Sequence, residues 1–333
     1  MPGACPAHHR RRRRHLVPRR GPAGRAWCST TRPPHSGRGE PAATGGAGCH
    51  HHPMSSPSAQ PVSLPARPVV GVLHPGAMGA ALGSALKARA GAVIWADAGR
   101  SHATAKRAEL ADLQAVPTVA DLAARADVIV SICPPHAARE VAGLVGAGLA
   151  GRTDRPLYVE ANAVSPDTVR GIATLLGDRA TVCDGAVIGP PAWTVGTTTL
   201  WLSGPGADTA ATLLEPGPFD ARVLGTAGTD LGAASGLKAC FALQSKAAPM
   251  LWLALEEAAA AFGVTGALHA ELDRAGVDHA AALARARERM AGKAWRWAGE
   301  MDEAADAFAA AGVPDGFSRA AAELYRRAAG AGG

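Results

Sequence analysis

The stretch Val-Val-Gly-Val-Leu-His-Pro-Gly-Ala-Met-Gly, residues 69–79, decides the fold of this 333-residue chain. An apolar run rich in β-branched residues meets a tight turn with Gly76 and Gly79, and a segment rich in Ala and Leu follows. This order predicts a strand, a turn and a helix that together bind the pyrophosphate of a dinucleotide. Gly76 allows the backbone to approach the phosphates, and Gly79 allows the helix to pack closely against the strand.

The start of the expected helix provides free N–H groups and a positive dipole end, which suit a bound anion. The motif is imperfect, because His74 stands where the G-x-G-x-x-G pattern has its first glycine. We expect the turn to line the cofactor site through His74, Pro75, Gly76, Ala77, Met78 and Gly79.

Strand and helix patterns alternate after this turn. Strands are expected at residues 69–73, 92–96, around Val116, 127–132 and 157–160, and helices at 77–89, 101–110, from Thr118, 136–147 and 166–176. Ser101 and Ser165 are suitable N-caps, and Thr118 with Asp121 forms a variant of the capping box. This alternation predicts an α/β Rossmann fold, a doubly wound parallel sheet.

The pattern changes after residue 180. Two more strands are expected at 181–188 and 198–203, and the strand signal ends near residue 225. From Asp230 the chain is rich in Ala and Leu with helical spacing. The sequence therefore predicts a Rossmann domain at residues 67–225, followed by an all-α C-terminal domain at residues 226–333.

Positive charge is concentrated at the start of the chain. Residues 1–53 hold ten Arg, no Lys and one acidic residue, whereas the other 280 residues hold 24 basic and 27 acidic residues. Residues 1–66 are rich in Pro and Gly without apolar periodicity, so we expect a disordered basic leader, with Met54 as a candidate internal start. Because the body is acidic and the leader lacks interleaved aromatic residues, we expect no nucleic-acid partner for Arg10–Arg14.

Other classes of protein are also disfavoured. No uncharged apolar run is long enough to cross a bilayer, so we expect no membrane association, and the leader lacks the apolar segment of a secretory signal. The few scattered cysteines indicate reduced thiols and a cytoplasmic protein. His50–His52 beside Cys49 have no spaced partner, so we expect no metal site.

Four further segments after the glycine turn match, in their order along the chain, the motifs of one protein family. They are VSICPP at residues 130–135, EANAVSP at 160–166, DGAVIGPP at 184–191 and GAASGLK at 232–238. Together with the turn they resemble the β-hydroxyacid dehydrogenase superfamily, which includes 6-phosphogluconate and 3-hydroxyisobutyrate dehydrogenases. The resemblance covers roughly residues 68–275. Within this superfamily, the sequence is most similar to a bacterial branch of 6-phosphogluconate-dehydrogenase-like oxidoreductases with a C-terminal domain of unassigned function. It implies a long linking helix and an all-helical domain that often builds a homodimer.

The resemblance also implies roles for single residues. Lys238 would exchange a proton with the substrate hydroxyl, a role suited to a lysine whose pKa is lowered by partial burial. Asn162 would lie between the nicotinamide and the substrate, and Cys133 and Pro134 would meet the cofactor at the carboxyl edge of the sheet. The alternatives are an ordinary helix lysine, a turn-forming Asn and a buried thiol.

The chain departs from the family at two places. In the expected substrate loop, Ile188, Gly189, Pro190 and Pro191 replace the family's Ser-Gly-Gly, and the two prolines remove two backbone donors. We still expect Ile188, Gly189 and Pro190 to bind the substrate, but the change disfavours a small, simple hydroxyacid.

Ala242 stands where the family has Asn or Asp, one turn after the lysine. Lys246 lies eight residues after Lys238 and so on nearly the same helix face. It is a candidate for binding an anionic substrate or for lowering the pKa of Lys238, and the alternative is a solvated surface lysine.

The choice of cofactor stays open between NADP and NAD. Asp97 ends the second strand and suits the ribose of NAD, whereas Arg100 and Ser101 suit the 2′-phosphate of NADP, which the resemblance favours. We expect an NAD(P)-dependent oxidoreductase acting on the CH–OH group of an anionic hydroxyacid or a related alcohol or carbonyl compound. The alternatives are an imine reductase-like enzyme, which usually lacks this lysine, and a non-catalytic nucleotide-binding sensor.

Overall fold

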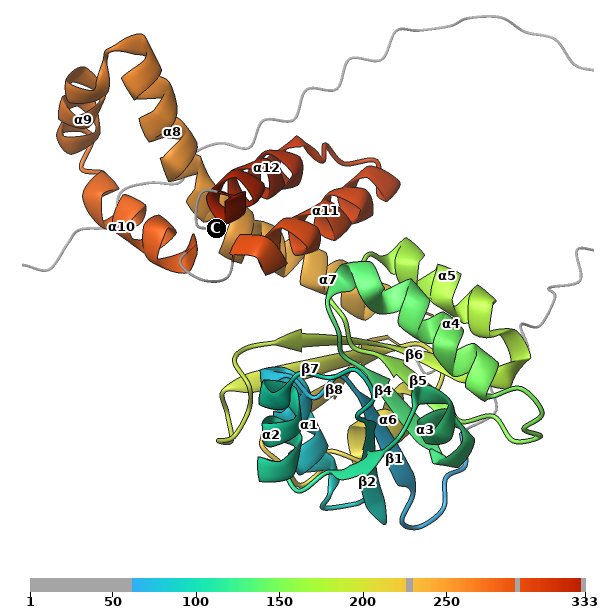
Figure 1. Cartoon of the computed structure of the whole chain (residues 1–333). Helices are drawn as coiled ribbons and strands as arrows, with labels where there is room; N and C mark the ends of the chain where they lie inside the picture. The colour runs from blue at the N-terminus through green and yellow to red at the C-terminus, as the bar shows by residue number, and fades with distance from the viewer. Residues whose placement is uncertain (1–61, 226–229, 291–293, 331–333) are drawn as a thin grey trace, which may run out of the picture. The chain divides into compact units, whose positions relative to one another are not determined.

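The computed structural model describes residues 62–225, 230–290 and 294–330 (Figure 1). The expected basic leader, its Arg run, its His triplet and Met54 lie outside the described residues, apart from residues 62–66. Within the described part, a β-sheet with helices on both faces is followed by a helical region. The expected fold class, a Rossmann fold followed by an all-α region, is confirmed.

The described residues form a sheet of eight strands in the order β3-β2-β1-β4-β5-β6-β7-β8. The strands are β1 Val69–Leu73, β2 Ala92–Ala96, β3 Gln114–Val116, β4 Val128–Ser131, β5 Leu157–Glu160, β6 Thr181–Ile188, β7 Thr198–Ser203 and β8 Phe219–Val223. All neighbouring pairs are parallel except β6 and β7, which are antiparallel. The strand order reverses between β1 and β4, the position at which doubly wound sheets bind their ligands.

Helices cover both faces of the sheet. They are α1 Ala77–Leu86, α2 His102–Leu110, α3 Val119–Arg125, α4 Ala138–Gly148, α5 Pro166–Leu176 and α6 Ala207–Thr212. Alternate strand residues point to opposite faces. One face packs against α1, α2 and α6, and the other packs against α3, α4 and α5.

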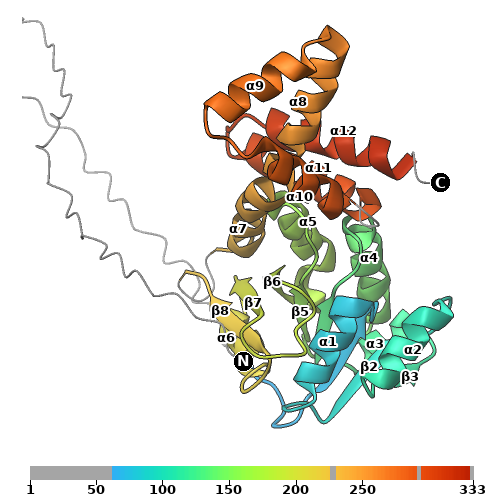
Figure 2. The ribbon, with the colours of Figure 1, turned by 90° about the vertical axis from the view of Figure 1, so that its left-hand side faces the viewer.

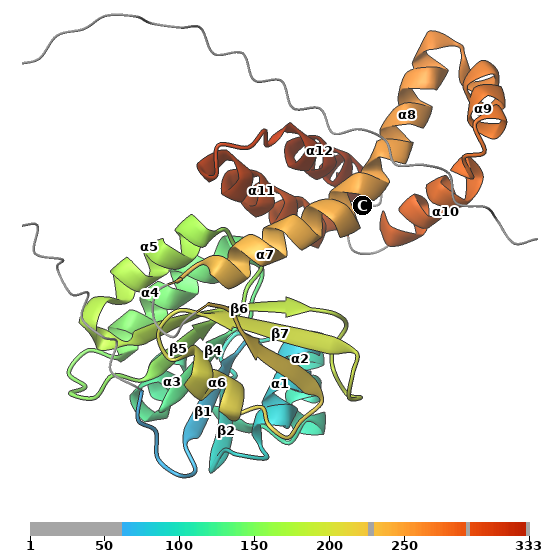
Figure 3. The same ribbon diagram turned by 180° about the vertical axis from the view of Figure 1, so that it is seen from behind.

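A long helical segment leads away from the sheet (Figures 1 and 3). It consists of α7 Ala233–Ala242, a π-helical turn at Leu243–Ala247 and α8 Ala248–Phe262. The remaining helices are α9 Thr265–Arg274, α10 His279–Met290, α11 Ala294–Ala310 and α12 Gly316–Gly330. Met250, Met301 and Tyr325 lie in the core that α8, α11 and α12 share. At the other end of the segment, α5 lies beside α7 (Figures 1 and 2).

The expected helix caps are present. Ser101, Thr118 and Ser165 each cap the following helix through the side-chain oxygen, and Thr118 with Asp121 completes a capping box. Among the described residues, no helix combines the length and apolar character needed to span a membrane.

Some expected element boundaries are wrong. The first helix ends at Leu86 rather than residue 89, because the N–H groups of Lys87, Ala88 and Arg89 bond three residues back in a tighter turn. A short 3₁₀ turn at Pro135–Ala137 precedes α4, whose start was expected at residue 136. The sequence analysis also missed α6 and the edge strand β8.

Candidate active site

The glycine turn leaves the start of α1 open. Gly76 is the N-cap of α1 and has no side chain to cap the first-turn N–H groups, and a Cβ added there would meet nothing within 4 Å. At Gly79, by contrast, a Cβ would lie 2.6 Å from the carbonyl oxygen of His74, so a side chain would push α1 away from the turn. This open helix start suits an anionic ligand such as a pyrophosphate.

Arg100 lies near His74 and Cys133 at the carboxyl edge of the sheet. Burial, with the charge of Arg100 as a smaller cause, lowers the pKa of His74 to about 4. Among the described residues, His74 Nδ1 and Arg100 Nε are buried without a hydrogen-bond partner. Because buried polar atoms are normally paired, these two atoms fit a polar ligand at this edge. The unpaired polar atoms and the open helix start therefore fit a dinucleotide.

The Cys133 thiol is half-buried. Burial, with the nearby charge of Glu160 as a smaller cause, raises its pKa to about 12. The sulfur is therefore protonated at neutral pH, which agrees with the buried-thiol alternative. Cys133 and Pro134 nevertheless come shortly after β4, which ends at Ser131, so their backbone lies at the carboxyl edge of the sheet.

The loop after β2 holds the three residues expected to choose the cofactor. Asp97 is exposed, and the Arg100 N–H donates to the Asp97 carbonyl at 3.1 Å. The Ser101 hydroxyl accepts the N–H of Thr104 at 3.3 Å as the cap of α2. This geometry is compatible with either NAD or NADP.

Asn162 ties the end of β4 to the end of β5. Its Oδ1 accepts the N–H of Cys133, its Nδ2 donates to Ser131 Oγ at 3.0 Å, and its own N–H donates to Glu160 Oε1 at 3.0 Å. The Asn162 side chain is only 3% exposed. These contacts place it at the same sheet edge as the glycine turn, and its role toward the substrate stays a prediction.

A row of buried polar residues crosses this edge, and the sequence analysis missed it. Ser131 lies opposite Glu160, Glu160 opposite Asp184, and Asp184 opposite Ser203, on four neighbouring strands. All four are fully buried. Burial raises the pKa of Glu160 to about 8, and the charge of Asp184 adds to the shift. A polar residue that ends each apolar run, as in VIVS and LYVE, was the signal that could have located the row.

Asp184 caps the helix that carries Lys238. The helix α7 begins after Gly232, which has φ of +104° and no side chain to cap it. Asp184 accepts the Ser235 hydroxyl at 2.6 Å and the Ser235 N–H at 2.8 Å, and Ser203 Oγ accepts the Ala234 N–H at 3.0 Å. Side chains of the polar row therefore accept the backbone N–H groups that the first turn of α7 leaves without a partner in the helix.

Lys238 lies beside the expected substrate loop. Its Nζ donates to the carbonyl oxygen of Val187, the residue before Ile188. Burial lowers the pKa of Lys238 to about 8, and the charge of Arg296 adds to the shift. The structure thus brings together Lys238 and the start of the loop, and the roles expected of both stay predictions.

The loop itself is held against β7. Gly189 has φ of +134°, and a Cβ added there would lie 2.5 Å from the carbonyl oxygen of Thr197. The Thr198 hydroxyl donates to the carbonyl oxygen of Pro190. These contacts fix the path of the backbone through residues 189 and 190, which therefore requires glycine at the first position.

Lys246 is paired within the protein. Its side chain is 18% exposed and forms an ion pair with Glu300 of α11, which is 7% exposed. Its Nζ also lies 5.7 Å from the centre of a Trp297 ring. Burial lowers the pKa of Lys246, as do the charges of Lys238 and Arg296. Lys246 is therefore not a solvated surface lysine.

Ala242 is buried and lines a small cavity together with Lys238, Glu300 and Glu303. Two carboxylates of α11 thus approach the position at which the family has a polar side chain. Among residues 62–225, 230–290 and 294–330, no cluster of His, Cys, Asp or Glu could hold a metal ion.

Two family models match the chain. A Rossmann-like domain matches residues 54–176, and a domain of unknown function, DUF1932, matches residues 259–328. No curated protein matches the sequence.

Solved structures share the fold. The 3-hydroxyisobutyrate dehydrogenase of Mycobacterium tuberculosis has a TM-score of 0.57 and 18% identity over 78% of this chain and 93% of its own. The 3-hydroxyisobutyrate dehydrogenase of Salmonella typhimurium has a TM-score of 0.56 and 21% identity over 79% and 95% of the two chains. A conserved protein of unknown function, described as similar to 3-hydroxyacid dehydrogenases, has a TM-score of 0.55 and 24% identity over 78% and 97%. At these identities the comparison establishes a shared fold.

Proposed function

We propose that this chain, a β-hydroxyacid dehydrogenase-like protein with a Rossmann-like domain and a DUF1932 domain, is an NAD(P)-dependent oxidoreductase. It acts on a carbon that bears a hydroxyl or carbonyl group. The observation that carries this proposal is the position of Lys238. Its ammonium group lies at the end of β6, at the same carboxyl edge of the sheet as the open glycine turn. Its pKa is lowered to about 8.

Residues at the carboxyl edge would hold the dinucleotide. The N–H groups at the start of α1 would bind the pyrophosphate, and the backbone at Cys133 and Pro134 would flank the nicotinamide. A bound nicotinamide would supply the hydride donor or acceptor. The unpaired Arg100 Nε supports NADP over NAD, because a guanidinium suits the 2′-phosphate.

Lys238 handles the proton that accompanies hydride transfer. In oxidation, its neutral amine takes the proton from the substrate hydroxyl as the carbonyl group forms. In reduction, its ammonium group returns that proton to the carbonyl oxygen. A pKa of about 8 keeps both forms populated near neutral pH, which is the condition for efficient acid–base catalysis.

The substrate would lie between Lys238, Asn162 and the loop at Ile188, Gly189 and Pro190. Because Glu300 already balances the charge of Lys246, an anionic substrate would bind there in competition with this ion pair. We retain as proposals the anionic hydroxyacid-type substrate, the homodimer built by residues 226–333 and the cytoplasmic location.

The test compares the full chain with its Lys238→Ala variant in turnover of hydroxyacids and the corresponding carbonyl compounds with both cofactors. We expect kcat to fall by about 10²- to 10⁴-fold, with nucleotide binding retained. Lys106→Ala, a change at an exposed lysine of α2, is the control and should leave kcat unchanged. Unchanged turnover in Lys238→Ala contradicts the assigned role. Nucleotide binding by a wild-type chain without turnover favours the sensor alternative.

A further inference from the structure

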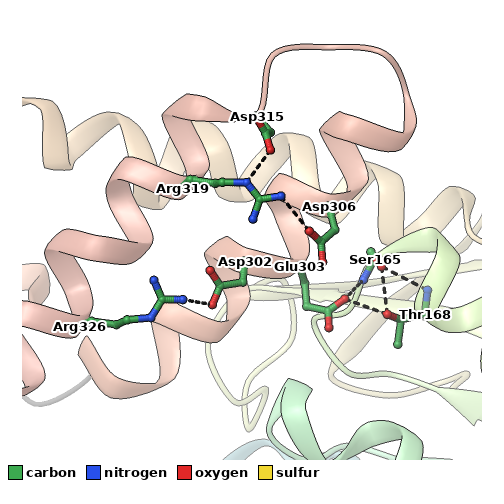
Figure 4. Close-up of polar contacts among 8 residues, drawn as sticks. All are labelled: Ser165, Thr168, Asp302, Glu303, Asp306, Asp315, Arg319 and Arg326. Carbon is green, nitrogen blue, oxygen red and sulfur yellow. Dashed lines mark hydrogen bonds and ion pairs between the residues drawn. The ribbon is translucent and has the colours of Figure 1, made fainter.

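Glu303 of α11 lies against the start of α5 (Figure 4). Its Oε2 accepts the Ser165 N–H at 2.7 Å and the Thr168 hydroxyl at 3.0 Å. Ser165 is the N-cap of α5, and its own hydroxyl accepts the Thr168 N–H at 3.2 Å. One carboxylate of the helical region therefore contacts both Ser165 and Thr168 at the start of α5.

Glu303 completes a capping box from a distant part of the sequence. In a local box, an acid or amide three residues after the N-cap reaches back to the N-cap N–H, as Asp121 does for Thr118 in α3. In α5 that position is Thr168, whose side chain is too short to do the same. Glu303 supplies the missing acceptor, and its negative charge is favourable at a helix N-terminus.

The neighbouring acids of α11 have a different role. Asp302 pairs with Arg326, and Asp306 pairs with Arg319, both on α12 (Figure 4). These pairs connect α11 to α12 on the surface. Of these three acids, Glu303 is the one that reaches α5.

The contact lies next to both candidate catalytic side chains. Ser165 ends the turn of residues 161–165, which carries Asn162. The small cavity beside Lys238 is lined by Glu303 and by Ala163 and Val164 of this turn. Glu303 therefore lies between the turn that carries Asn162 and the helix that carries Lys238.

We propose that Glu303 is a positioning residue that holds the 161–165 turn against α11 and so sets Asn162 relative to Lys238. The inference rests on the proposed function. Because Glu303 belongs to the DUF1932 domain, it assigns this domain a role in arranging the active site. Glu303 acts through the backbone N–H of Ser165 and the hydroxyl of Thr168 and takes no proton from the substrate.

The test uses the full chain and four variants. Glu303→Ala removes both contacts, and Glu303→Gln keeps an oxygen that accepts the N–H. Thr168→Val removes one donor and leaves Glu303 in place. Asp302→Ala is the matched control, because it removes an acid of the same helix that pairs only with α12 among the contacts described. The readouts are hydrogen exchange of the Ser165 amide, kcat, and the dissociation constant of the nucleotide.

We expect Glu303→Ala to speed exchange at Ser165 and to lower kcat by about tenfold or more, because small displacements of reacting groups slow catalysis strongly. Thr168→Val should lower kcat less, Glu303→Gln should restore most of it, and the nucleotide dissociation constant should stay constant. Asp302→Ala should leave exchange and kcat unchanged even where it lowers Tm.

Three results would overturn the inference: a Glu303→Ala enzyme with wild-type kcat, an equal loss in Asp302→Ala, or unchanged exchange at Ser165. If Glu303→Ala does not fold, a wild-type kcat in Thr168→Val with unchanged exchange overturns it. A wild-type chain that shows neither turnover nor nucleotide binding contradicts the proposed function itself, which is a separate outcome.

Discussion

The ammonium group of Lys238 donates a hydrogen bond to the backbone carbonyl of Val187 in β6. The same strand carries Asp184, which accepts two hydrogen bonds from Ser235 in α7. The strand β6 therefore contacts the helix α7 at two points. The two contacting residues are three positions apart in the strand, Asp184 and Val187, and three positions apart in the helix, Ser235 and Lys238. These two contacts hold Lys238 at the end of the strand. They are made by the buried carboxylate of Asp184 and the backbone carbonyl of Val187.

The pH dependence of turnover should follow Lys238. Because its pKa is lowered to about 8, the rate of oxidation should rise with pH and level off above about 8, where the amine is neutral. The rate of reduction should fall over the same range, because it needs the ammonium form. Initial rates in both directions between pH 6 and pH 10 check this. A profile without this opposite trend would contradict the acid–base role.

Asp184→Ala should destabilise the protein. The change leaves the Ser235 N–H and hydroxyl buried without their acceptor, which costs about 3 kcal/mol. Asp184→Asn should cost less, because its amide can still pair with both groups. Urea unfolding measures the free energies, and Asp178→Ala, at a fully exposed position, is the control expected to cause no change. A stable Asp184→Ala protein would show that α7 does not depend on this cap.

Glu160 should make stability fall as pH rises. Its pKa in the folded protein is raised to about 8, so the folded state holds a proton that the unfolded state releases near pH 4.5. The resulting stabilisation is fully present below pH 4.5 and is lost as pH rises through about 8. Glu160→Gln removes this dependence while keeping an acceptor for the Asn162 N–H. Unfolding free energies of both proteins at pH 5, 7 and 9 test the difference, and parallel curves would contradict it.

Sequence patterns predicted the fold where they were local. The strands at residues 69–73, 92–96 and 157–160 are mostly apolar runs. Ser101 and Ser165 each accept an N–H only three residues further along the chain, so both helix starts could be predicted from local sequence. Strand β8 was missed because Phe219–Val223 lies at the sheet edge with mostly half-exposed residues and so lacks a clear alternation.

The candidate site was predictable only in part, for the same reason. The order of the motifs pointed to the glycine turn, Lys238 and the loop at residues 188–190 as candidate site residues. The Lys246–Glu300 and Glu303–Ser165 contacts join segments far apart in the sequence, and no local pattern records such pairs. The π-helical turn at Leu243–Ala247, which contains Lys246, also changes the helix face that simple spacing assigns to this lysine.

Cofactor preference should depend on the loop after β2. Arg100→Ala should weaken NADPH binding by about tenfold or more and change NADH binding little, because in the proposed function the guanidinium would pair with a 2′-phosphate that NADH lacks. Asp97→Ala should weaken NADH binding instead, through loss of the ribose contact. Dissociation constants for both cofactors check this. Equal effects of Arg100→Ala on both cofactors would contradict a 2′-phosphate contact.

The central claim is that this chain binds a nicotinamide dinucleotide at the carboxyl edge of its sheet. Fluorescence titration of the full chain with NADPH and with NADH tests it most directly. We expect saturable binding of at least one of them, with NADPH the tighter, and loss of that binding when Gly79 is replaced by Val, which displaces α1 from the turn. A cooperatively folded chain that binds neither cofactor would contradict the account.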